Sequence, residues 1–219
     1  MLLVFFDGEN HGRYRCRSEK DLLNVDLANP DTVDAGGEAL HRELIYINRR
    51  QFIWHGAYNE LLMVHNFDRQ PHVVTISMHF AADFADIFEI RGQPRAKRGR
   101  RSAGCESSDT VVLRYSGVDG VERATMLRFE PAPLRLDTQY AQFVLTLKGG
   151  EGKRIVLRIS CRAPAKQAWN IREYYRALRA SRDALRPALA PIAGDLARWL
   201  DDRKIKHLRG APYHPVTQG

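Results

Sequence analysis

The segment HVVTISMHF, residues 72–80, alternates apolar and polar side chains. Every second residue from Val74 to Phe80 is apolar, and the residues between them are polar. A period of two places the apolar side chains on one face of a β-strand. Sheets with one buried and one solvated face are typically antiparallel. The segment therefore predicts an antiparallel sheet that packs against a core on one side.

The same period of two continues in both directions, from about Leu40 to Arg162. Two glycine-containing turns, Gly149–Lys153 and Asp119-Gly120, are expected to close β-hairpins. We expect a mainly β fold in which two antiparallel sheets pack as a β-sandwich. The further segments expected as strands are residues 43–47, 51–54, 60–66, 110–115, 124–129, 142–148 and 154–162.

The pattern becomes helical after Cys161. Asn170 is a good helix N-cap with Glu173 three residues later, and Pro191 is well placed to begin a second helix. The apolar stripe of the first helix has no evident partner, which marks it as an interaction surface. The first stripe consists of Ile171, Tyr174, Tyr175, Leu178 and Leu185, and the second of Ile192, Leu196, Trp199 and Leu200.

These changes of pattern divide the chain into four segments. We expect an N-terminal lead over residues 1–20, a β-sandwich domain over 21–165, a helical linker over 166–206 and an unstructured tail over 207–219. No segment repeats at a fixed period.

The composition is that of a globular protein, with 44% hydrophobic and 27% charged residues in a chain of 219. The formal net charge is +8, but 26 acidic residues are interspersed with 34 basic ones, so charge alone indicates no polyanion partner. Cys16, Cys105 and Cys161 form no CxxC pair and fit a reducing cytoplasm. The apolar opening Leu2–Phe6 lacks the basic lead of a signal peptide, and no run is long enough to span a bilayer. We expect a cytoplasmic protein without membrane attachment.

The strand expected at residues 72–80 leads into FAADFADIFEIRGQPRAKRGRR, residues 80–101, where three carboxylates precede a basic run. Paired carboxylates can hydrolyse a glycosidic bond when they face each other across a sugar. Asp83, Asp86 and Glu89 come from one short segment, which does not easily place two of them on opposite sides of a substrate. The favoured interpretation is structural: Asp86 and Glu89 cap backbone amides or pair with Arg91.

The basic run at residues 93–101 fits a solvated loop better than a nucleic-acid site, because no aromatic residue between Gly92 and Arg114 can stack on bases. His65, His72 and His79 share a seven-residue spacing, which does not converge on a metal ion when the residues lie on strands. No metal-binding, nucleophile-elbow or phosphate-loop motif is present. We therefore expect no metal, no cofactor and no nucleic-acid partner.

The stretch Leu40–Gly92 resembles the N-terminal domain of bacterial and archaeal glycogen-debranching-enzyme-like proteins of the amylo-α-1,6-glucosidase type. The most specific piece is DFADIFEIRG, Asp83–Gly92, which in that family follows a strand of the kind seen at Val73–Phe80. The arginine pair of INRRQFIW and the strand that ends at Asn66 support the resemblance. DLLNVDLANPD, Asp21–Asp31, looks like the family's edge strand.

The resemblance, over roughly residues 20–165, implies a mutarotase-like supersandwich. In the family this domain precedes a helical linker and an (α/α)6 barrel that carries the catalytic carboxylates for α-glucan hydrolysis. The barrel and the family's glycine- and arginine-rich opening segment are not visible here, so no catalytic residue is carried over. The resemblance implies a junction in which Phe84, Ile87 and Phe88 supply core while the charges fix a turn or a docking face. This structural or docking motif consists of Asp83, Phe84, Asp86, Phe88, Glu89, Arg91 and Gly92.

We expect a non-catalytic β-sandwich module of an α-glucan-processing glycoside-hydrolase-like protein, truncated before its barrel. Its expected partners are that barrel and an α-glucan. One alternative is a free-standing sugar enzyme of the mutarotase type that uses His79 with Asp83 or Glu89. A second is a carbohydrate-binding module with contacts at Trp54, Tyr58 or Trp169, although core packing is the favoured role of Trp54 and Trp169. A third is a polyanion-binding module that uses the basic run, which added salt would weaken.

Overall fold

The computed structural model describes residues 2–6, 14–19, 22–93, 97–161 and 169–185. The chain divides into two compact units, Met1–Leu178 and Arg179–Gly219, and each is considered by itself. The helix expected from Pro191 and the tail expected over residues 207–219 lie outside the described residues. None of the helices within the described residues has the length and apolar character of a membrane span.

The first unit consists mainly of strands, with a helical turn, α1 (Ile87–Ile90), between β8 and β9 and the beginning of the C-terminal helix at its end. The first seven strands are β1 (Leu2–Phe6), β2 (Tyr14–Glu19), β3 (Leu22–Ala28), β4 (Thr32–Val33), β5 (Ala39–Leu40), β6 (Ile45–Trp54) and β7 (Ala57–Asn66). The others are β8 (His72–Phe80), β9 (Arg100–Ser107), β10 (Thr110–Ser116), β11 (Glu122–Glu130), β12 (Arg135–Leu136), β13 (Tyr140–Leu147) and β14 (Gly152–Ser160).

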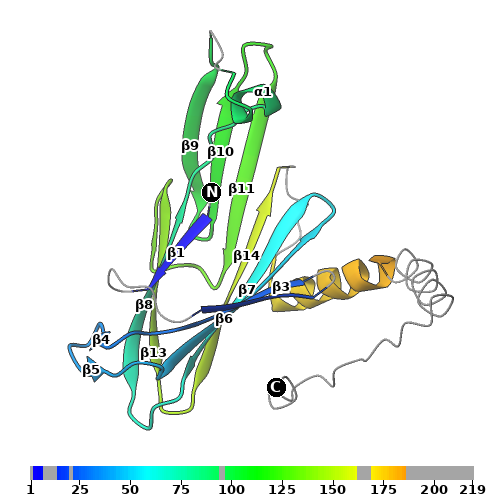
Figure 1. The fold of residues 1–219 in the computed structure, drawn as a ribbon. Coiled ribbons are helices and arrows are strands. Elements are labelled where there is room, and N and C mark those ends of the chain that lie inside the picture. Colours follow the sequence, from blue (N-terminus) through cyan, green and yellow to red (C-terminus); the bar gives the residue numbers. More distant parts are fainter. Residues whose placement is uncertain (1, 7–13, 20–21, 94–96, 162–168, 186–219) are drawn as a thin grey trace, which may run out of the picture. The chain divides into compact units, whose positions relative to one another are not determined.

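Two antiparallel sheets form the expected β-sandwich (Figure 1). The smaller sheet has the strand order β1-β8-β13-β12, and the larger has the order β2-β3-β6-β7-β14-β11-β10-β9. The main core lies between them and combines Ile76 and Met78 of β8 with Leu62 of β7 and Leu157 of β14. All four side chains are at most 1% exposed, and burial of each contributes about 1.5–3 kcal/mol. The alternation at residues 72–80 thus predicted the buried face of β8 correctly.

The glycine-rich turn Gly149–Lys153 does not close a hairpin, and that prediction is wrong. β13 lies in the smaller sheet beside β8, whereas β14 lies in the larger sheet beside β7. The turn therefore carries the chain from one sheet to the other. A side chain at Gly149 would lie 2.4 Å from the carbonyl oxygen of Arg69, so the close approach of the two connections requires glycine. The Asp119-Gly120 hairpin, by contrast, is confirmed by the pairing of β10 with β11.

Asn66 joins this crossing to the neighbouring connection between β7 and β8. The residue is fully buried, and its Nδ2 donates to the carbonyl oxygens of Gln70 (2.8 Å), Leu147 (3.2 Å) and Lys148 (3.1 Å). Satisfying these buried carbonyls offsets the cost of removing them from water. One side chain therefore holds together two of the places where the chain changes sheets.

Several strand boundaries differ from the prediction. Instead of two strands at residues 43–47 and 51–54, the single strand β6 runs from Ile45 to Trp54, because this whole segment pairs without a break with β7. Arg49 in its middle pairs with the buried Glu60 of β7. The segment Asp21–Asp31 is no edge strand, since β3 pairs with both β2 and β6. The basic run expected as a loop supplies the start of β9. Two strands of the expected N-terminal lead, β1 and β2, belong to the sheets.

The C-terminal helix is described over residues 171–185. Asn170 caps it as predicted, because its Oδ1 accepts the backbone N–H groups of Arg172 (3.0 Å) and Glu173 (3.2 Å).

The apolar stripe of this helix has a partner within the first unit. Tyr174 is fully buried and Leu178 is 7% exposed, in a second core cluster with Phe52, Leu61 and Val156 on the outer face of the larger sheet. The prediction of an unpartnered stripe is therefore wrong for these two residues.

Candidate functional site

The loop between β8 and β9 folds around one capped helical turn. Oδ1 of Asp86 accepts the backbone N–H groups of Phe88 (2.9 Å) and Glu89 (2.8 Å), and Oε2 of Glu89 accepts the N–H of Asp86 (3.2 Å). This reciprocal pair is a capping box. Gly92 ends the turn with φ of +86°, a conformation that favours glycine, and its N–H donates to the carbonyl oxygen of Glu89 (3.0 Å). Backbone N–H groups therefore bind one oxygen of each carboxylate.

Two contacts through Tyr115 hold this loop against β10, and an ion pair closes the loop on itself. The ring of Phe84 stacks on Tyr115 with centroids 5.4 Å apart and planes at 13°. The hydroxyl of Tyr115 accepts the N–H of Gly99 at 2.8 Å, and Arg98 pairs with Glu89 at 2.8 Å. Phe84 has φ of +51°, which is uncommon for a residue other than glycine, so its stacking and core contacts keep the backbone in a costly conformation.

Phe88 does not contribute to the core, in contrast to the expectation. It is 57% exposed, and Ile90 on the same turn is 71% exposed. The side chain of Ile87 lies outside the described part of the chain. Arg91 is exposed, and Asp83 accepts the backbone N–H of Ala85 at 3.2 Å. The motif thus presents two apolar side chains to solvent from a turn with both ends capped.

A pocket of about 590 Å³ lies beside this loop, and that volume falls within the range of small-molecule sites. His79, Phe80 and Phe84 line it, with further residues from β9, β10 and the turn before β13. None of its described lining residues is Asp or Glu, so neither Asp83 nor Glu89 joins His79 there. The mutarotase-type alternative required that convergence in one concave site, and the geometry does not provide it.

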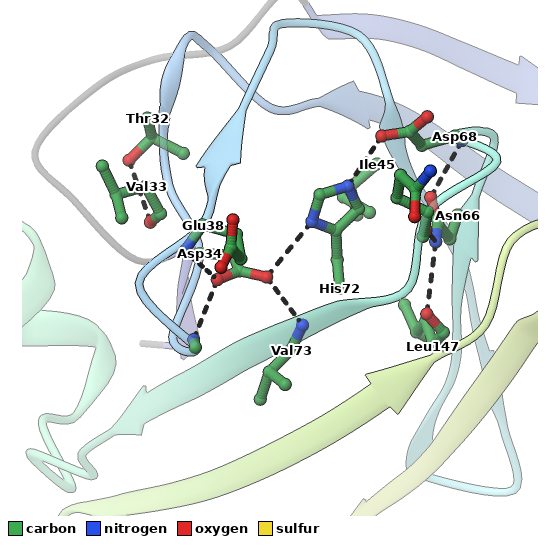
Figure 2. Close-up of polar contacts among 12 residues, drawn as sticks. Thr32, Val33, Asp34, Glu38, Ile45, Asn66, Asp68, His72, Val73 and Leu147 are labelled. Atoms are coloured by element: carbon green, nitrogen blue, oxygen red, sulfur yellow. Dashed lines mark hydrogen bonds and ion pairs between the residues drawn. The ribbon is translucent and has the colours of Figure 1, made fainter.

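Figure 2 shows a polar cluster that the sequence did not single out, centred on His72. Its Nδ1 lies 3.1 Å from Oδ2 of Asp34, and its Nε2 lies 2.8 Å from Oδ2 of Asp68. The ring is only 3% exposed. Asp34 also accepts the backbone N–H groups of Gly36, Glu38 and Val73. The cluster ties the loop before β5 to the connection between β7 and β8.

The charged forms of His72, Asp34 and Asp68 stabilise one another. Burial by itself would lower the pKa of His72, but hydrogen bonds to Asp68 and Asp34 outweigh it and raise that pKa above its usual value. Burial opposes ionisation of Asp34, but backbone N–H groups and His72 lower its pKa, while His72 lowers that of Asp68. The ring is too buried to contact a substrate. The cluster therefore has a structural role and joins the loop before β5 to the connection between β7 and β8.

Trp54 and Tyr58 do not form a common platform for a sugar. Tyr58 packs against the main core between the sheets, and its hydroxyl donates to Oε2 of Glu60 at 2.8 Å. Trp54 packs against the second cluster and lies edge-on to His55, with ring centroids 4.3 Å apart. The two rings therefore lie on opposite faces of the larger sheet.

Two further features of the described residues are potential metal ligands and free thiols. In the part of the chain that the structure describes, no three His, Cys, Asp or Glu side chains come together to hold a metal ion. Cys105 and Cys161 are free and exposed.

A family model described as the N-terminal domain of (some) glycogen debranching enzymes matches residues 13–158. The chain belongs to this family. The matched range includes the capped loop and the His72 cluster, and it ends within β14. The match to the glycogen-debranching-enzyme N-terminal domain therefore stops before the C-terminal helix, although residues of that helix complete the second core cluster.

Several solved structures are similar to this domain at low sequence identity. A protein assigned as a kojibiose phosphorylase from the human microbiome is 10% identical with a TM-score of 0.49; the match covers 84% of this chain and 24% of that one. An Escherichia coli K12 protein assigned as an aldose 1-epimerase is 9% identical with a TM-score of 0.42, covering 68% of both chains. A galactose mutarotase related enzyme from Lactobacillus acidophilus is 6% identical with a TM-score of 0.36, covering 72% and 73%. No curated protein sequence matches the chain significantly.

Proposed function

We propose that the chain is a non-catalytic β-sandwich module of an α-glucan-processing glycoside-hydrolase-like protein. The observation that carries this proposal is the family match over residues 13–158. The module supports a catalytic (α/α)6 barrel and helps to shape its substrate cleft. It works in the cytoplasm, where Cys105 and Cys161 stay reduced.

The capped loop is the surface that we propose for contact with the barrel. Phe88 and Ile90 are exposed large apolar side chains on one turn, and the Asp86 capping box together with the Phe84–Tyr115 stack holds that turn in place. Exposed apolar side chains on a positioned element favour contact with another domain, because their burial is favourable and little ordering is needed.

The test combines the chain with a separately purified debranching-type (α/α)6 barrel that lacks its own N-terminal sandwich. We expect the chain alone to release no glucose from a branched limit dextrin. We expect the mixture to raise both the Tm of the barrel and its rate of glucose release, since binding to the folded state stabilises it.

Matched variants locate the contact. Phe88→Asp combined with Ile90→Asp is expected to abolish the stimulation, whereas Val33→Asp, at a residue that is also exposed (58%), leaves it intact. Glucose release by the chain alone in proportion to its concentration would contradict the non-catalytic assignment. A barrel whose Tm and rate do not respond to the chain would contradict the supporting role.

A further inference from the structure

A row of polar and aromatic side chains lies on the outer face of the larger sheet, across β3, β6 and β7. We call it the outer-face row. It consists of Asp26, Tyr46, Asn48, Arg50, His65 and Phe67.

Strand register brings this row together. On β6, Tyr46, Asn48 and Arg50 are separated by two residues each, so their side chains share a face and repeat about every 7 Å. Phe52 continues the same alternation and belongs to the second core cluster, which lies on the outer face of the larger sheet. Tyr46, Asn48 and Arg50 therefore lie on that face as well. Asp26 of β3 is paired in register with Asn48 and lies beside it.

A chain of hydrogen bonds orients the polar members. Nε of Arg50 donates to Oδ1 of Asn48 (2.8 Å), Nδ2 of Asn48 donates to Oδ1 of Asp26 (2.6 Å), and the Tyr46 hydroxyl donates to the same oxygen. Burial and the Asp26 carboxylate raise the pKa of Tyr46 to about 12, so the phenol keeps its proton. Each group is therefore positioned before any ligand arrives, which reduces the entropy lost on binding.

Two members of the row have hydrogen-bonding groups that no described side chain uses. Among the side chains that the structure describes, which do not include those of β2, nothing donates to Oδ2 of Asp26, and nothing accepts from the two terminal nitrogens of Arg50. An ionised carboxylate accepts and a guanidinium donates. The row thus offers an acceptor and a fork of donors to one neutral ligand rich in hydroxyl groups.

An aromatic corner closes one end of the row. Phe67 is 62% exposed, with its ring centroid 4.3 Å from that of His65 and 6.1 Å from that of Tyr46. Gly152, paired with His65, makes room for this arrangement, since a side chain there would approach Nδ1 of His65 to 2.9 Å. At the other end, the Tyr174 hydroxyl donates to the carbonyl oxygen of Arg50 at 3.0 Å, so the C-terminal helix bounds the row.

We propose that the outer-face row binds an α-glucan chain, with one sugar ring against Phe67 and hydroxyl groups on Asp26 and Arg50. The chemistry favours a neutral oligosaccharide over a protein surface, because one exposed ring stands beside oriented polar groups and not in an apolar patch. The inference rests on the proposed function for its ligand class. It also replaces Trp54 and Tyr58, which lie on opposite faces of the sheet, with residues that share one face.

Binding of maltoheptaose to the full chain, without any barrel, tests this site by calorimetry and by NMR chemical shifts. We expect Phe67→Ala to weaken binding at least about tenfold, as loss of a ring contact requires. Phe88→Ala removes a ring of similar exposure (57%) from another part of the surface and is expected to leave the Kd for maltoheptaose unchanged. Arg50→Gln is expected to weaken binding while leaving the backbone contact to Tyr174 in place.

Three outcomes would overturn the site. They are no binding at about 10 mM ligand, equal affinity in wild type and Phe67→Ala, or a Kd that rises steeply between about 0.05 M and about 0.5 M salt, as for a polyanion site. A failure here leaves stimulation of the barrel untouched. Conversely, glucan binding without any effect on a barrel would keep the row and reject the supporting role.

Discussion

Burial lowers the pKa of His72, whereas the Asp68 and Asp34 carboxylates raise it, and the effect of the carboxylates is the larger. A histidine with a raised pKa adds stability that is fully present below its unfolded pKa of about 6.5 and is lost as pH rises through the folded pKa. Asp34 and Asp68, with lowered pKa values, add stability above their usual pKa and lose it as pH falls through the lowered values. The cluster is therefore most stabilising between about pH 4 and about pH 6.5.

We predict that His72→Gln lowers the free energy of unfolding by about 2 kcal/mol near pH 6, because buried Asp34 loses a hydrogen bond to a charged donor. Urea unfolding at a series of pH values should show the difference from wild type shrinking above neutral pH. His41→Gln is the control, since its side chain is 82% exposed beside Asp31. A difference that stays constant across this range would show that His72 is not charged in the folded protein.

Glu60 is the other buried charge that the fold depends on. Its carboxylate accepts from Arg49, from Nε2 of Gln51 (3.2 Å) and from the hydroxyl of Tyr58 (2.8 Å). Glu60→Gln should cost about 3 kcal/mol, because it leaves the Arg49 charge buried without a counter-charge. The double variant with Arg49→Met should cost at least about 1 kcal/mol less than the sum of the single changes. Additive losses in urea unfolding would mean that the two charges do not act as a pair.

The elements show which features of this fold a sequence pattern can carry. A period of two predicted β8 and its buried face, because burial of one face requires it. The period does not encode which strands pair, so it predicts a hairpin at the turn after β13, where the chain in fact changes sheets. His72 falls on the inward face of β8, and an inward histidine needs polar partners, so the period of two itself indicates a polar cluster there.

The structural or docking motif could be predicted from local sequence, whereas the outer-face row could not. Asp86, Glu89 and Gly92 stand at the spacing of a capped turn, so local sequence was enough to suggest their capping role. The outer-face row depends on register between β3, β6 and β7, which brings Asp26 to Asn48 from 22 residues away. No local period reports a contact of that kind.

The C-terminal helix provides a matched pair of tyrosines. Tyr174 is fully buried and lies edge-on to Phe52 with ring centroids 5.2 Å apart. Tyr175 is 40% exposed, and its ring contacts that of Tyr174 with centroids 5.4 Å apart. Tyr174→Ala should therefore cost about 3–5 kcal/mol in thermal or urea unfolding, and Tyr175→Ala should stay within about 0.5 kcal/mol of wild type. Tyr174→Phe isolates the hydrogen bond to Arg50 and should cost about 1 kcal/mol. Equal losses in the two alanine variants would mean that the helix is not docked on the sheet.

At the scale of the whole molecule, the family match and the folding unit do not have the same limits. The match ends at residue 158, but Trp169, Tyr174 and Leu178 are buried in the second core cluster. A chain cut after residue 168 would expose the opposite side of that cluster, which includes Phe52 and Leu61. The sandwich as the family defines it therefore lacks part of its own apolar cover.

We predict that a chain ending at residue 168 unfolds roughly 10–20 °C lower than the full chain, since it loses several kcal/mol of apolar burial. It should also bind an apolar-surface dye, because the outer face of the larger sheet is then uncovered. A chain ending at residue 185 keeps all three buried residues and serves as the control, with a Tm close to that of the full chain. Equal Tm values and no dye binding in the shorter chain would mean that the sandwich is complete at the end of the family match. A large difference would make residues 169–178 part of the domain itself, so any partner barrel would meet the helix as a fixed surface of the sandwich.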